Sequence, residues 1–561
     1  MGKRDIDYVC NPQSVAVIGA SAKQGKWGHE VLKGIIEGGY EGKLYPINPR
    51  GGEILGLKAY PTILDIEGPV DLAIIGIKAP LVLNAIKECK QKGVKAVLVI
   101  TAGFAETGKE GRELQQEALK AAGKMRVVGP NTLGVFDLGN KFNATFLHPL
   151  KGPIDILSQG GNAAVELQIN ANKRGVGFNK FIHFGNQSDV GLVDCLDYAQ
   201  DDPNAKVIVI YLEGLRPGEG SGLLKVARKA ARKKPIIALK TGATKEGAMG
   251  AKSHTGSLAG EDRIYDAALK QAGVIRVQNS HDLLDVAEAA MKLPPMRGNR
   301  VGVLTDGGSH SAMGCDALAR GGLTLGTLSE ETQRKLKEIL LSQSITWNPV
   351  DFAGAVDEDL SLFPRVAELM LQDSGIDGLL IAGALFGGYS KWFGATNEEE
   401  VIRGIASLSA KYNKPISMHN YFGREDAPVL RIMDESGVLV QTQVEVAAKC
   451  LSVVWLYNKY LERDSIVGRL PVTADTLKSI NKVFEKANAH GRSSLLEYEA
   501  KEILVNYDIP ITKFKLAKSE DEAISIAQSF GYPVAAKVVS AQIIHQTDDG
   551  GVKLDLLSDD H

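Results

Sequence analysis

The chain has 561 residues, well beyond the usual size of one domain, so we expect about three or four domains with separate cores. Its 65 lysine and arginine residues against 67 aspartate and glutamate residues give a formal net charge of -2. This balance argues against a broad electrostatic surface for nucleic acid or an acidic membrane, so any anion site must be local.

The cysteine spacing indicates that the cysteines are reduced, and the N-terminal sequence bears on the cellular compartment. The five cysteines lie far apart and form no CxxC pair, which fits neither a disulfide framework nor a zinc site, and we expect no protein-held metal. The start "MGKRDIDYVCNPQSVAVIGAS" has no apolar signal region, and "VKAVLVITAGFA" is too short to span a bilayer. We therefore expect a soluble, cytoplasmic protein with no nucleic-acid or membrane partner.

Three times along the chain a short β-branched strand ends in a small-residue loop and leads into a helical pattern. These segments are "SVAVIGASAKQGKWG" (14–28), "PIDILSQGGNAAVELQI" (153–169) and "RVGVLTDGGSHSAMGCDALA" (300–319). Further apolar strands include "VDLAIIGI", "KVIVIYLEG" and "PIIALKTG". Apolar strands alternating with amphipathic helices are typical of parallel sheets covered on both faces. The sequence therefore predicts an α/β protein with three doubly wound units.

The C-terminal part has a different character. The stretch from 465 to 490 mixes a proline-bearing turn with a charged helix and is typical of a connector. After it, "SSLLEYEAKEILVNYDIPI" has a capping serine and helical spacing, and "YPVAAKVVS" has the pattern of a strand. We expect a fourth domain that begins here with too few residues to be complete. The expected domains are 1–145, 146–293, 294–464, the connector 465–490, and 491–561.

The first glycine loop departs from the dinucleotide-binding pattern. Residues 19–28 do not match GxGxxG, and the next strand ends in Asn48, Pro49 and Arg50, without the acidic residue that binds a ribose diol. A cationic strand end beside a helix N-terminus suits a phosphorylated ribose or another polyphosphate. The alternatives are a purely structural tight turn and a nicotinamide-dependent dehydrogenase, which the missing pattern disfavours.

A single histidine, His254, lies among small residues in "KSHTGSLAG" (252–260), and we expect a loop there with space for a large anionic group. In "ILSQGGNAAVEL", Ser158, Gly160 and Gly161 end a strand and open a helix, where backbone N–H groups hold a phosphate. Glu213 ends an apolar strand, where a carboxylate can orient an imidazole. The alternatives are a buried, hydrogen-bonded ring and a surface or helix-capping carboxylate. Together, these residues predict a histidine that carries phosphate covalently.

Several motifs along the chain resemble those of a known family. The stretches "VAVIGAS", "YPINP", "ITAGFAETG", "GPNTLGV", "ILSQGG", "DDPNAKVIVIYLEG", "KSHTGSLAG", "NPVDFAG" and "YPVAAKVVSAQIIHQTDDGGVKL" resemble the ADP-forming acyl-CoA synthetases of the succinyl-CoA synthetase superfamily, in their fused form. That resemblance implies a Rossmann-like CoA-binding domain, two flavodoxin-like ligase domains and an ATP-grasp domain that is only begun here. The Mg2+-binding carboxylates expected on later ATP-grasp strands lie outside these residues, so we expect a truncated or partly unseen domain.

The resemblance also assigns roles to residues. It implies that His254 is phosphorylated, that Glu213 orients it, and that Ser158, Gly160 and Gly161 hold the phosphate. It implies that Lys537 contacts the nucleotide phosphates and that His545 relays phosphate between two active regions. The CoA and acyl site would be lined by Gly19, Ala20, Ser21, Lys26, Asn48, Pro49, Arg50, Thr101, Glu106 and Asn131.

Three motifs depart from the family pattern. SQSG is "SQGG" with Gly160, which removes a hydroxyl from the phosphate site. GPNC is "GPNT" with Thr132, and HKSD is "HQTD" with Gln546 and Thr547, which removes a cation near His545. The relay is therefore less firmly implied than the role of His254.

The function that follows is a carboxylate–CoA ligase that forms ADP, with a phosphohistidine and an acyl phosphate as intermediates. Its ligands would be CoA, ATP or ADP, phosphate, Mg2+ and a short or hydroxylated carboxylic acid, and its assembly a homodimer or larger homo-oligomer. The aromatic stretch 383–400 either shapes an acyl pocket or is a surface loop. The alternative function is a non-catalytic acyl-CoA or nucleotide sensor, which would need neither His254 nor Glu213.

Overall fold

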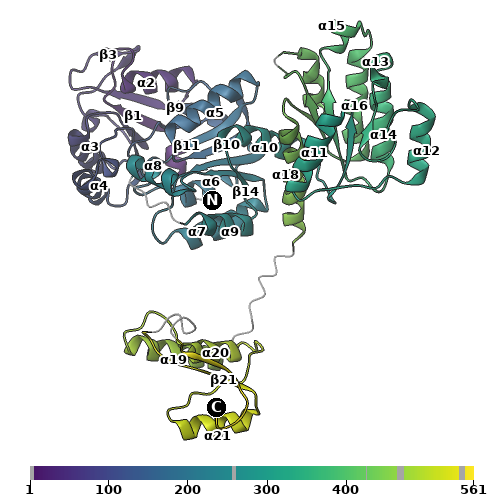
Figure 1. The fold of residues 1–561 in the computed structure, drawn as a ribbon. Helices are drawn as coiled ribbons and strands as arrows, with labels where there is room; N and C mark the ends of the chain where they lie inside the picture. The colour runs from purple at the N-terminus through teal and green to yellow at the C-terminus, as the bar shows by residue number, and fades with distance from the viewer. Residues whose placement is uncertain (1–4, 256–260, 425, 464–472, 543–549) are drawn as a thin grey trace. The chain divides into compact units, whose positions relative to one another are not determined.

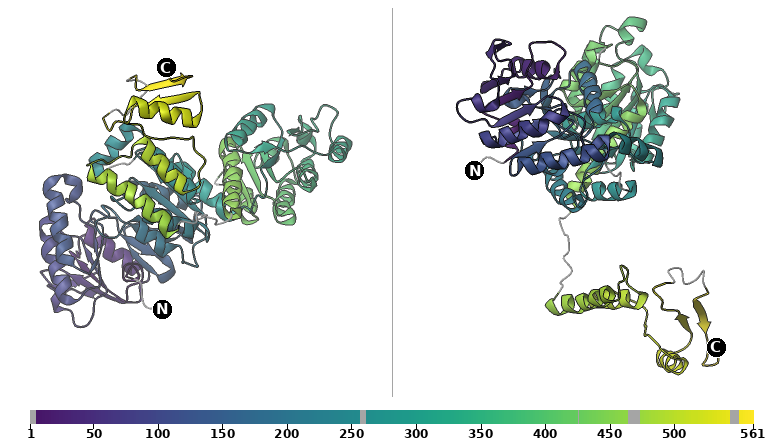
Figure 2. Two further views of the ribbon diagram at one scale, coloured as in Figure 1. Left: turned by 90° about the horizontal axis from the view of Figure 1, so that it is seen from below. Right: turned by 90° about the vertical axis from the view of Figure 1, so that its left-hand side faces the viewer.

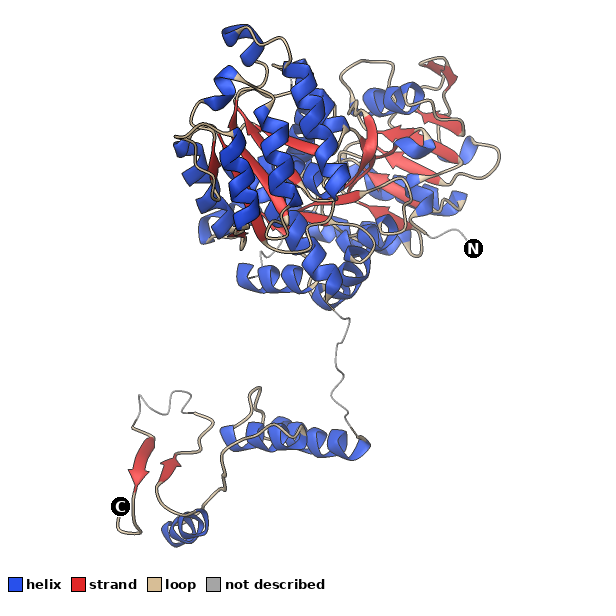
Figure 3. Cartoon of the chain, turned by 90° about the vertical axis from the view of Figure 1, so that its right-hand side faces the viewer, coloured by secondary structure: helices blue, strands red, loops and turns tan. Residues whose placement is uncertain are grey.

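The computed structural model describes residues 5–255, 261–424, 426–463, 473–542 and 550–561, with the backbone alone for 251–255 (Figure 1). The chain divides into two compact units, Met1–Arg463 and Asp464–His561. In the larger unit, Figure 3 shows helices on both faces of the red strands. The predicted α/β fold with parallel sheets is confirmed, because the described strands of this unit form three mainly parallel sheets and one small antiparallel pair, Glu53–Ile54 with Leu57–Lys58.

The first sheet is parallel in all its described pairings, with the strand order β2-β1-β5-β6-β7. The strands β1, β5 and β6 are buried along their whole length, as their unbroken apolar sequences require. The winding direction changes between β1 and β5, and a crevice opens at such a point outside the carboxyl ends of the strands. The elements are α1 Asp7–Cys10, β1 Ser14–Ile18, α2 Trp27–Glu37, β2 Lys43–Ile47, β3 Glu53–Ile54, β4 Leu57–Lys58, η1 Ile63–Asp65, β5 Leu72–Ile75, α3 Ala79–Lys92, β6 Ala96–Val99, η2 Ala105–Thr107, α4 Lys109–Ala122 and β7 Arg126–Val128.

The second sheet has the order β14-β13-β12-β10-β11-β8-β9 in the described chain. The hairpin β8–β9 is antiparallel to its neighbours, so residues 135–144 already pair with this sheet. The elements are β8 Val135–Asp137, η3 Leu138–Asn140, β9 Phe142–Ala144, β10 Lys151–Ser158, α5 Gly161–Lys173, β11 Phe178–His183, α6 Leu192–Ala199, β12 Val207–Leu212, α7 Gly220–Ala231, β13 Ile236–Lys240, α8 Lys245–Thr255, α9 Asp262–Gln271, β14 Ile275–Val277 and α10 Ser280–Lys292.

The third sheet repeats the doubly wound order as β16-β15-β18-β19-β20, with β17 also paired to β15. The long helix α18 packs against both α10 and α11, and so joins the second and third domains (Figure 1). The elements are β15 Arg300–Thr305, α11 Gly308–Arg320, β16 Thr324–Leu325, α12 Glu330–Ile339, β17 Val350–Asp351, α13 Ala355–Glu358, α14 Leu362–Gln372, β18 Gly378–Ala384, α15 Tyr389–Phe393, α16 Glu398–Tyr412, β19 Ile416–Asn420, η4 Pro428–Leu430, α17 Arg431–Glu435, β20 Val438–Gln441 and α18 Val444–Glu462.

The second unit is small, and its helix α19 packs against α20 (Figure 2, right). Its described strands form one antiparallel pair. Most of the predicted connector, 465–490, is the helix α19 of this unit. The elements are α19 Ala474–Ala489, α20 Glu497–Asn506, α21 Glu520–Phe530, β21 Val534–Lys537 and β22 Val552–Leu556. Among the helices that the structure describes, none has the length and apolarity needed to cross a bilayer.

A buried ion network holds the second and third domains together. Glu288 on α10 is fully buried, and Arg424 of the third domain binds both its carboxylate oxygens, at 2.8 and 3.0 Å. Lys292 adds a third bond at 2.9 Å. Burial opposes ionisation of Glu288, but the hydrogen bonds and charge of Arg424 outweigh burial and hold its pKa below the usual value.

Replacing Glu288 with glutamine should destabilise the larger unit, because it leaves the buried Arg424 guanidinium without its main counter-charge. We expect the free energy of unfolding to fall by about 3–5 kcal/mol, measured by chemical denaturation. The control is Glu338→Gln, which breaks an exposed pair with Arg334 and should cost less than about 1 kcal/mol. Equal stability of the two variants would contradict the network's role.

Candidate functional site

The first candidate site lies at the carboxyl edge of the first sheet, where the loops after β1 and β2 meet. The Asn48 amide nitrogen donates to the Ala20 carbonyl at 2.9 Å, and its amide oxygen accepts from the Arg50 N–H at 3.0 Å. Arg50 and Pro49 are exposed beside this bridge. The structure therefore brings the "GAS" and "NPR" segments together at the switch point, with a cation at the rim.

Glycine is required where the loop after β1 meets helix α2. Gly19 has a φ of +92°, and a side chain on Gly28 would lie 1.9 Å from the Gly19 carbonyl oxygen. The helix start therefore packs directly on the loop backbone. Ser21 and Lys26 follow on the same loop, and Lys26 directly precedes α2. Lys26 thus lies at the N-terminus of α2, where its charge and the helix dipole both favour an anion.

The other predicted residues of this edge follow β6 and β7. The Thr101 hydroxyl donates to the Ile77 carbonyl at 2.6 Å, and the Asn131 N–H donates to the Thr101 carbonyl at 2.9 Å. The Glu106 carboxylate accepts from the Gly103 N–H at 2.6 Å and also from the Asn186 amide. Glu106 therefore ties this loop to the second domain.

The predicted phosphate cradle lies at the carboxyl end of β10 in the second sheet. Ser158 is the last residue of β10, and Gly161 is the first residue of α5. The Ser158 hydroxyl is buried and donates to the Gly160 carbonyl at 2.8 Å. No described side chain caps α5, so the N–H groups of its first turn are available to an anion.

Gln159, between those cradle residues, joins them to the neighbouring strand end. Its side-chain oxygen accepts two bonds, from the Glu213 N–H at 2.8 Å and the Gly214 N–H at 3.0 Å. Its own N–H donates to the Tyr211 carbonyl at 3.0 Å. Glu213 is buried with its carboxylate close to Gly160, since a side chain built on Gly160 would lie 3.2 Å from the Glu213 Oε1 atom.

A buried histidine, His183, is hydrogen-bonded to the backbone that leads into the cradle. The Leu133 N–H donates to the His183 Nδ1 atom at 2.8 Å, so His183 carries its proton on Nε2 and donates it to the Gln159 carbonyl at 2.9 Å. Burial lowers the pKa of His183 to about 4, because the charged ring would lose its hydration. The ring is therefore neutral near pH 7 and adds no positive charge to the site.

Tyr211 explains why glycine occupies position 160. A side chain on Gly160 would lie 2.5 Å from the Tyr211 ring, which is inside van der Waals contact. The ring thus occupies the space that a residue-160 side chain would need.

His254 lies in helix α8, so the prediction of a loop at this position is wrong for the residues up to Thr255. The reason is composition, because the alanines and lysines of "KEGAMGAK" favour a helix over the glycines between them. Helix α8 contacts η2 of the first domain, the turn that carries Glu106. The His254 side chain and residues 256–260 lie outside the part that the structure describes.

In the second unit, Lys537 is the last residue of β21, and its ammonium pairs with both Glu497 oxygens at 3.0 and 3.1 Å. This contact links β21 to α20. The predicted relay residue His545, with Gln546 and Thr547, lies outside the described residues.

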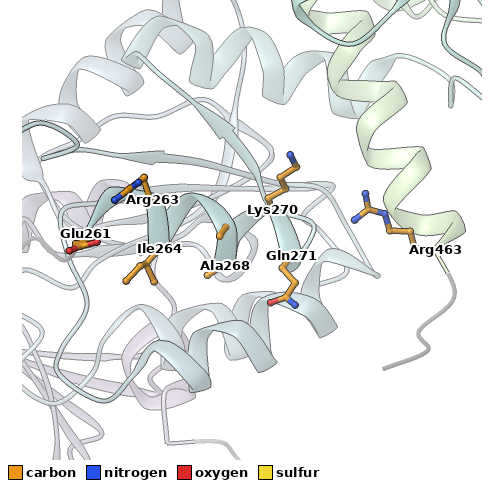
Figure 4. Close-up of a pocket in the computed structure, with 8 residues that line it drawn as sticks. Glu261, Arg263, Ile264, Ala268, Lys270, Gln271 and Arg463 are labelled. Atoms are coloured by element: carbon orange, nitrogen blue, oxygen red, sulfur yellow. The ribbon is translucent and has the colours of Figure 1, made fainter. Parts of the chain in front are cut away.

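An open groove of about 920 Å³ runs along α9 and faces Arg463 at the end of α18 (Figure 4). None of the predicted site residues lines it. The predicted residues lie instead at strand ends, where small loops and helix starts meet.

Sequence reasoning missed Gln159, His183 and Tyr211 as parts of the site. Gln159 lies within the "SQGG" motif, so the presence of a polar side chain between two cradle residues could have identified it as part of the site. His183 and Tyr211 lie on apolar strands of the second sheet, and only the pairing of β10 with β11 and β12 brings them together.

Three family models match the chain. They are a CoA-binding domain over residues 13–137, a succinyl-CoA-ligase-like flavodoxin domain over 151–290, and an ATP-grasp domain over 486–561. The first two contain the two carboxyl-edge sites described above, and the third contains Lys537. By family, this chain thus carries a CoA-binding domain, a succinyl-CoA-ligase-like flavodoxin domain and an ATP-grasp domain.

Two curated relatives align with almost the whole chain. The chain is 35% identical to the ADP-forming 4-hydroxybutyrate–CoA ligase of Nitrosopumilus maritimus, over 98% of this chain and 78% of that protein. It is 34% identical to the ADP-forming acetate–CoA ligase I of Archaeoglobus fulgidus, over 98% and 77%. The fold is similar to that of an acetyl-coenzyme A synthetase from Candidatus Korarchaeum cryptofilum solved with phosphate and ADP, with a TM-score of 0.73, 32% identity, and coverage of 81% of this chain and 98% of that chain.

Gly160→Ser should destabilise the protein, because the added side chain overlaps the Tyr211 ring. We expect a loss of about 1–3 kcal/mol in the free energy of unfolding, and partial recovery in the double variant with Tyr211→Leu. Gly220→Ser is the control, since a side chain there meets nothing within 4 Å. A Gly160→Ser protein as stable as the control would show that the ring moves aside freely.

The neutral His183 ring makes stability depend on pH. Its folded pKa of about 4 lies below the ordinary histidine value of 6.5, so the unfolded chain binds the proton more readily, and stability is lost as pH falls between these values. The difference corresponds to about 3 kcal/mol. Denaturation between pH 7 and pH 4 should show a shallower loss for His183→Gln than for the wild type. His490→Gln, at an exposed site, should retain the wild-type slope; equal slopes in all three proteins would contradict the assignment.

Proposed function

The chain belongs to the ADP-forming acyl-CoA ligases, and on that premise we propose that it converts a short or hydroxylated carboxylic acid, CoA and ATP into acyl-CoA, ADP and phosphate through a phosphohistidine at His254. One observation supports this most strongly. The structure places the open N-terminus of α5, with Gly160 and Gly161, next to the buried carboxylate of Glu213. This pairing provides an anion cradle beside a group able to orient an imidazole.

The proposed reaction has four steps. A ring nitrogen of His545 attacks the γ-phosphorus of ATP, forming an N–P bond and releasing ADP. A ring nitrogen of His254 then attacks that phosphorus, so the N–P bond to His545 breaks and an N–P bond to His254 forms. A carboxylate oxygen of the acid then attacks that phosphorus, so the N–P bond breaks and an acyl phosphate forms. The CoA thiolate finally attacks the acyl carbon, and the C–O bond to phosphate breaks. Activation is needed because a carboxylate is a poor acylating agent, and positioning and charge neutralisation supply most of the catalysis.

We propose that the second-sheet site carries out the phosphoryl steps. Glu213 would accept a hydrogen bond from one nitrogen of His254, which leaves the other nitrogen to attack phosphorus. The N–H groups at the start of α5, beside Ser158, Gly160 and Gly161, would hold the phosphoryl oxygens. The contact between α8 and η2 supports an approach of this site to the first domain.

We propose that CoA binds at the carboxyl edge of the first sheet. The loops that carry Gly19, Ala20, Ser21 and Lys26 would bind its phosphates through backbone N–H groups and one ammonium. Exposed Arg50, beside the Asn48 bridge and Pro49, would add a second cation at the rim. Thr101 and Asn131 would line the opposite side of the crevice, and Glu106 would hold that wall in place.

The nucleotide would bind to the second unit, where Lys537 lies at the end of β21 and would exchange Glu497 for phosphate oxygens. His545 would relay phosphate to His254. In the described residues, no group of three His, Cys, Asp or Glu side chains lies close enough together to hold a metal. We therefore assign no step to Mg2+, which would enter with the nucleotide.

The proposed acid class rests on the two relatives, which are named for 4-hydroxybutyrate and acetate. We propose that the protein works reversibly and in the cytoplasm, as a homodimer or larger homo-oligomer. A panel of acids and their CoA esters, assayed in both directions, tests substrate and direction together.

The first test is covalent labelling with 32P-phosphate and acetyl-CoA or 4-hydroxybutyryl-CoA. The wild type should acquire an acid-labile, base-stable label, His254→Asn should acquire none, and Glu213→Gln should label at least about 100-fold more slowly, because the imidazole loses its orienting group. His490→Asn, at an exposed histidine that directly follows α19 in the second unit, is the control and should label normally. Equal labelling of His254→Asn and the wild type would overturn the mechanism.

A further inference from the structure

We propose that Gln159 is a positioning residue for the phosphoryl steps. It would hold Glu213 at a fixed distance from the cradle through its amide oxygen, and donate to the phosphoryl group through its amide nitrogen. This inference rests on the proposed function of the second-sheet site.

The contacts of Gln159 join three strand ends. The side chain is 4% exposed, and its amide oxygen accepts the N–H bonds of Glu213 and Gly214 at 2.8 and 3.0 Å. Its carbonyl accepts from the His183 ring at 2.9 Å, which ties it to β11. The loop after β12 is thus attached to the residue that directly precedes Gly160 and the cradle helix.

The orientation of the amide follows from these partners. Both partners of the side chain are N–H donors, so the atom facing them must be the oxygen. The nitrogen then faces away from them with two hydrogens, and no described residue accepts a bond from it. This nitrogen is not one of the fully buried unpartnered side-chain atoms of the described residues, so it is accessible, and a phosphoryl oxygen on the cradle would be an acceptor of the required kind.

The consequence for catalysis is geometric. Glu213 is the first residue after β12, and from there the sheet no longer fixes its backbone N–H. The Gln159 oxygen takes over that role, so its loss would let the carboxylate move relative to Gly160. A misplacement of about 1 Å in a catalytic constellation costs about 100-fold in rate.

Two variants of the full chain separate the two halves of the proposal. Gln159→Met removes both the acceptor and the donor, whereas Gln159→Glu keeps an acceptor oxygen for the Glu213 and Gly214 N–H groups but removes the donor. Gln200→Met is the matched control, because Gln200 is buried in the same domain and its amide bonds only Asp197 among the described residues.

Two measurements are made on each protein. Hydrogen–deuterium exchange of residues 212–216 reports whether the N–H bonds persist, and the rate of 32P-phosphoenzyme formation from acyl-CoA is followed against phosphate concentration. Gln159→Met should lose protection and label about 100-fold more slowly. Gln159→Glu should keep protection but need at least about tenfold more phosphate for half-maximal labelling, because a donor is lost and a negative charge is gained. Gln200→Met should match the wild type in both.

Each outcome decides the matter. Unchanged protection in Gln159→Met, or lost protection with an unchanged labelling rate, overturns the positioning role. An unchanged phosphate dependence in Gln159→Glu overturns the donor role, and that variant serves alone if Gln159→Met does not fold. A wild-type protein that forms no phosphoenzyme contradicts the proposed function itself, and the exchange measurement then still tests the structural attachment.

Discussion

Two hydrogen bonds from the loop after β12 to the amide of Gln159 set the geometry on which the second-sheet site depends. They attach Glu213 and Gly214 to the residue that precedes the cradle helix. Because β10 and β12 are parallel neighbours, their carboxyl ends meet at one edge, and a single buried side chain can span them. The rigid sheet thus fixes the position of the Glu213 carboxylate relative to the cradle, so that neither loop needs to be rigid by itself.

In the second-sheet site, backbone dipoles provide the positive potential, which fits a chain whose acidic and basic residues are nearly equal in number. The N–H groups of α5 provide a positive end for an anion, while burial keeps the His183 ring neutral beneath them. Fixed dipoles in a partly dry site need little reorganisation when charge moves to a phosphoryl group.

Much of this arrangement could be predicted from the sequence, because apolar strands ending in glycine loops have a strong local pattern. The strand-end positions of Ser158, Gly160, Glu213 and Asn48 follow from it, whereas the hydrogen bond from Asn48 to Ala20 does not. The contacts of Gln159 could not be predicted, since they depend on which strands become neighbours in space. The helix at His254 was missed because the small residues suggested a loop, although alanine and lysine favour a helix.

The central claim is that one phosphoryl group is carried covalently on His254. The most direct measurement is peptide mapping by mass spectrometry under alkaline conditions, after the full chain has been incubated with acyl-CoA and inorganic phosphate. We predict one added phosphoryl group on the peptide that contains residues 252–260, and its disappearance when ADP or free acid is added as acceptor. A phosphoryl group found only on peptides that contain neither residue 254 nor residue 545, or none while acyl-CoA is consumed, would contradict the account.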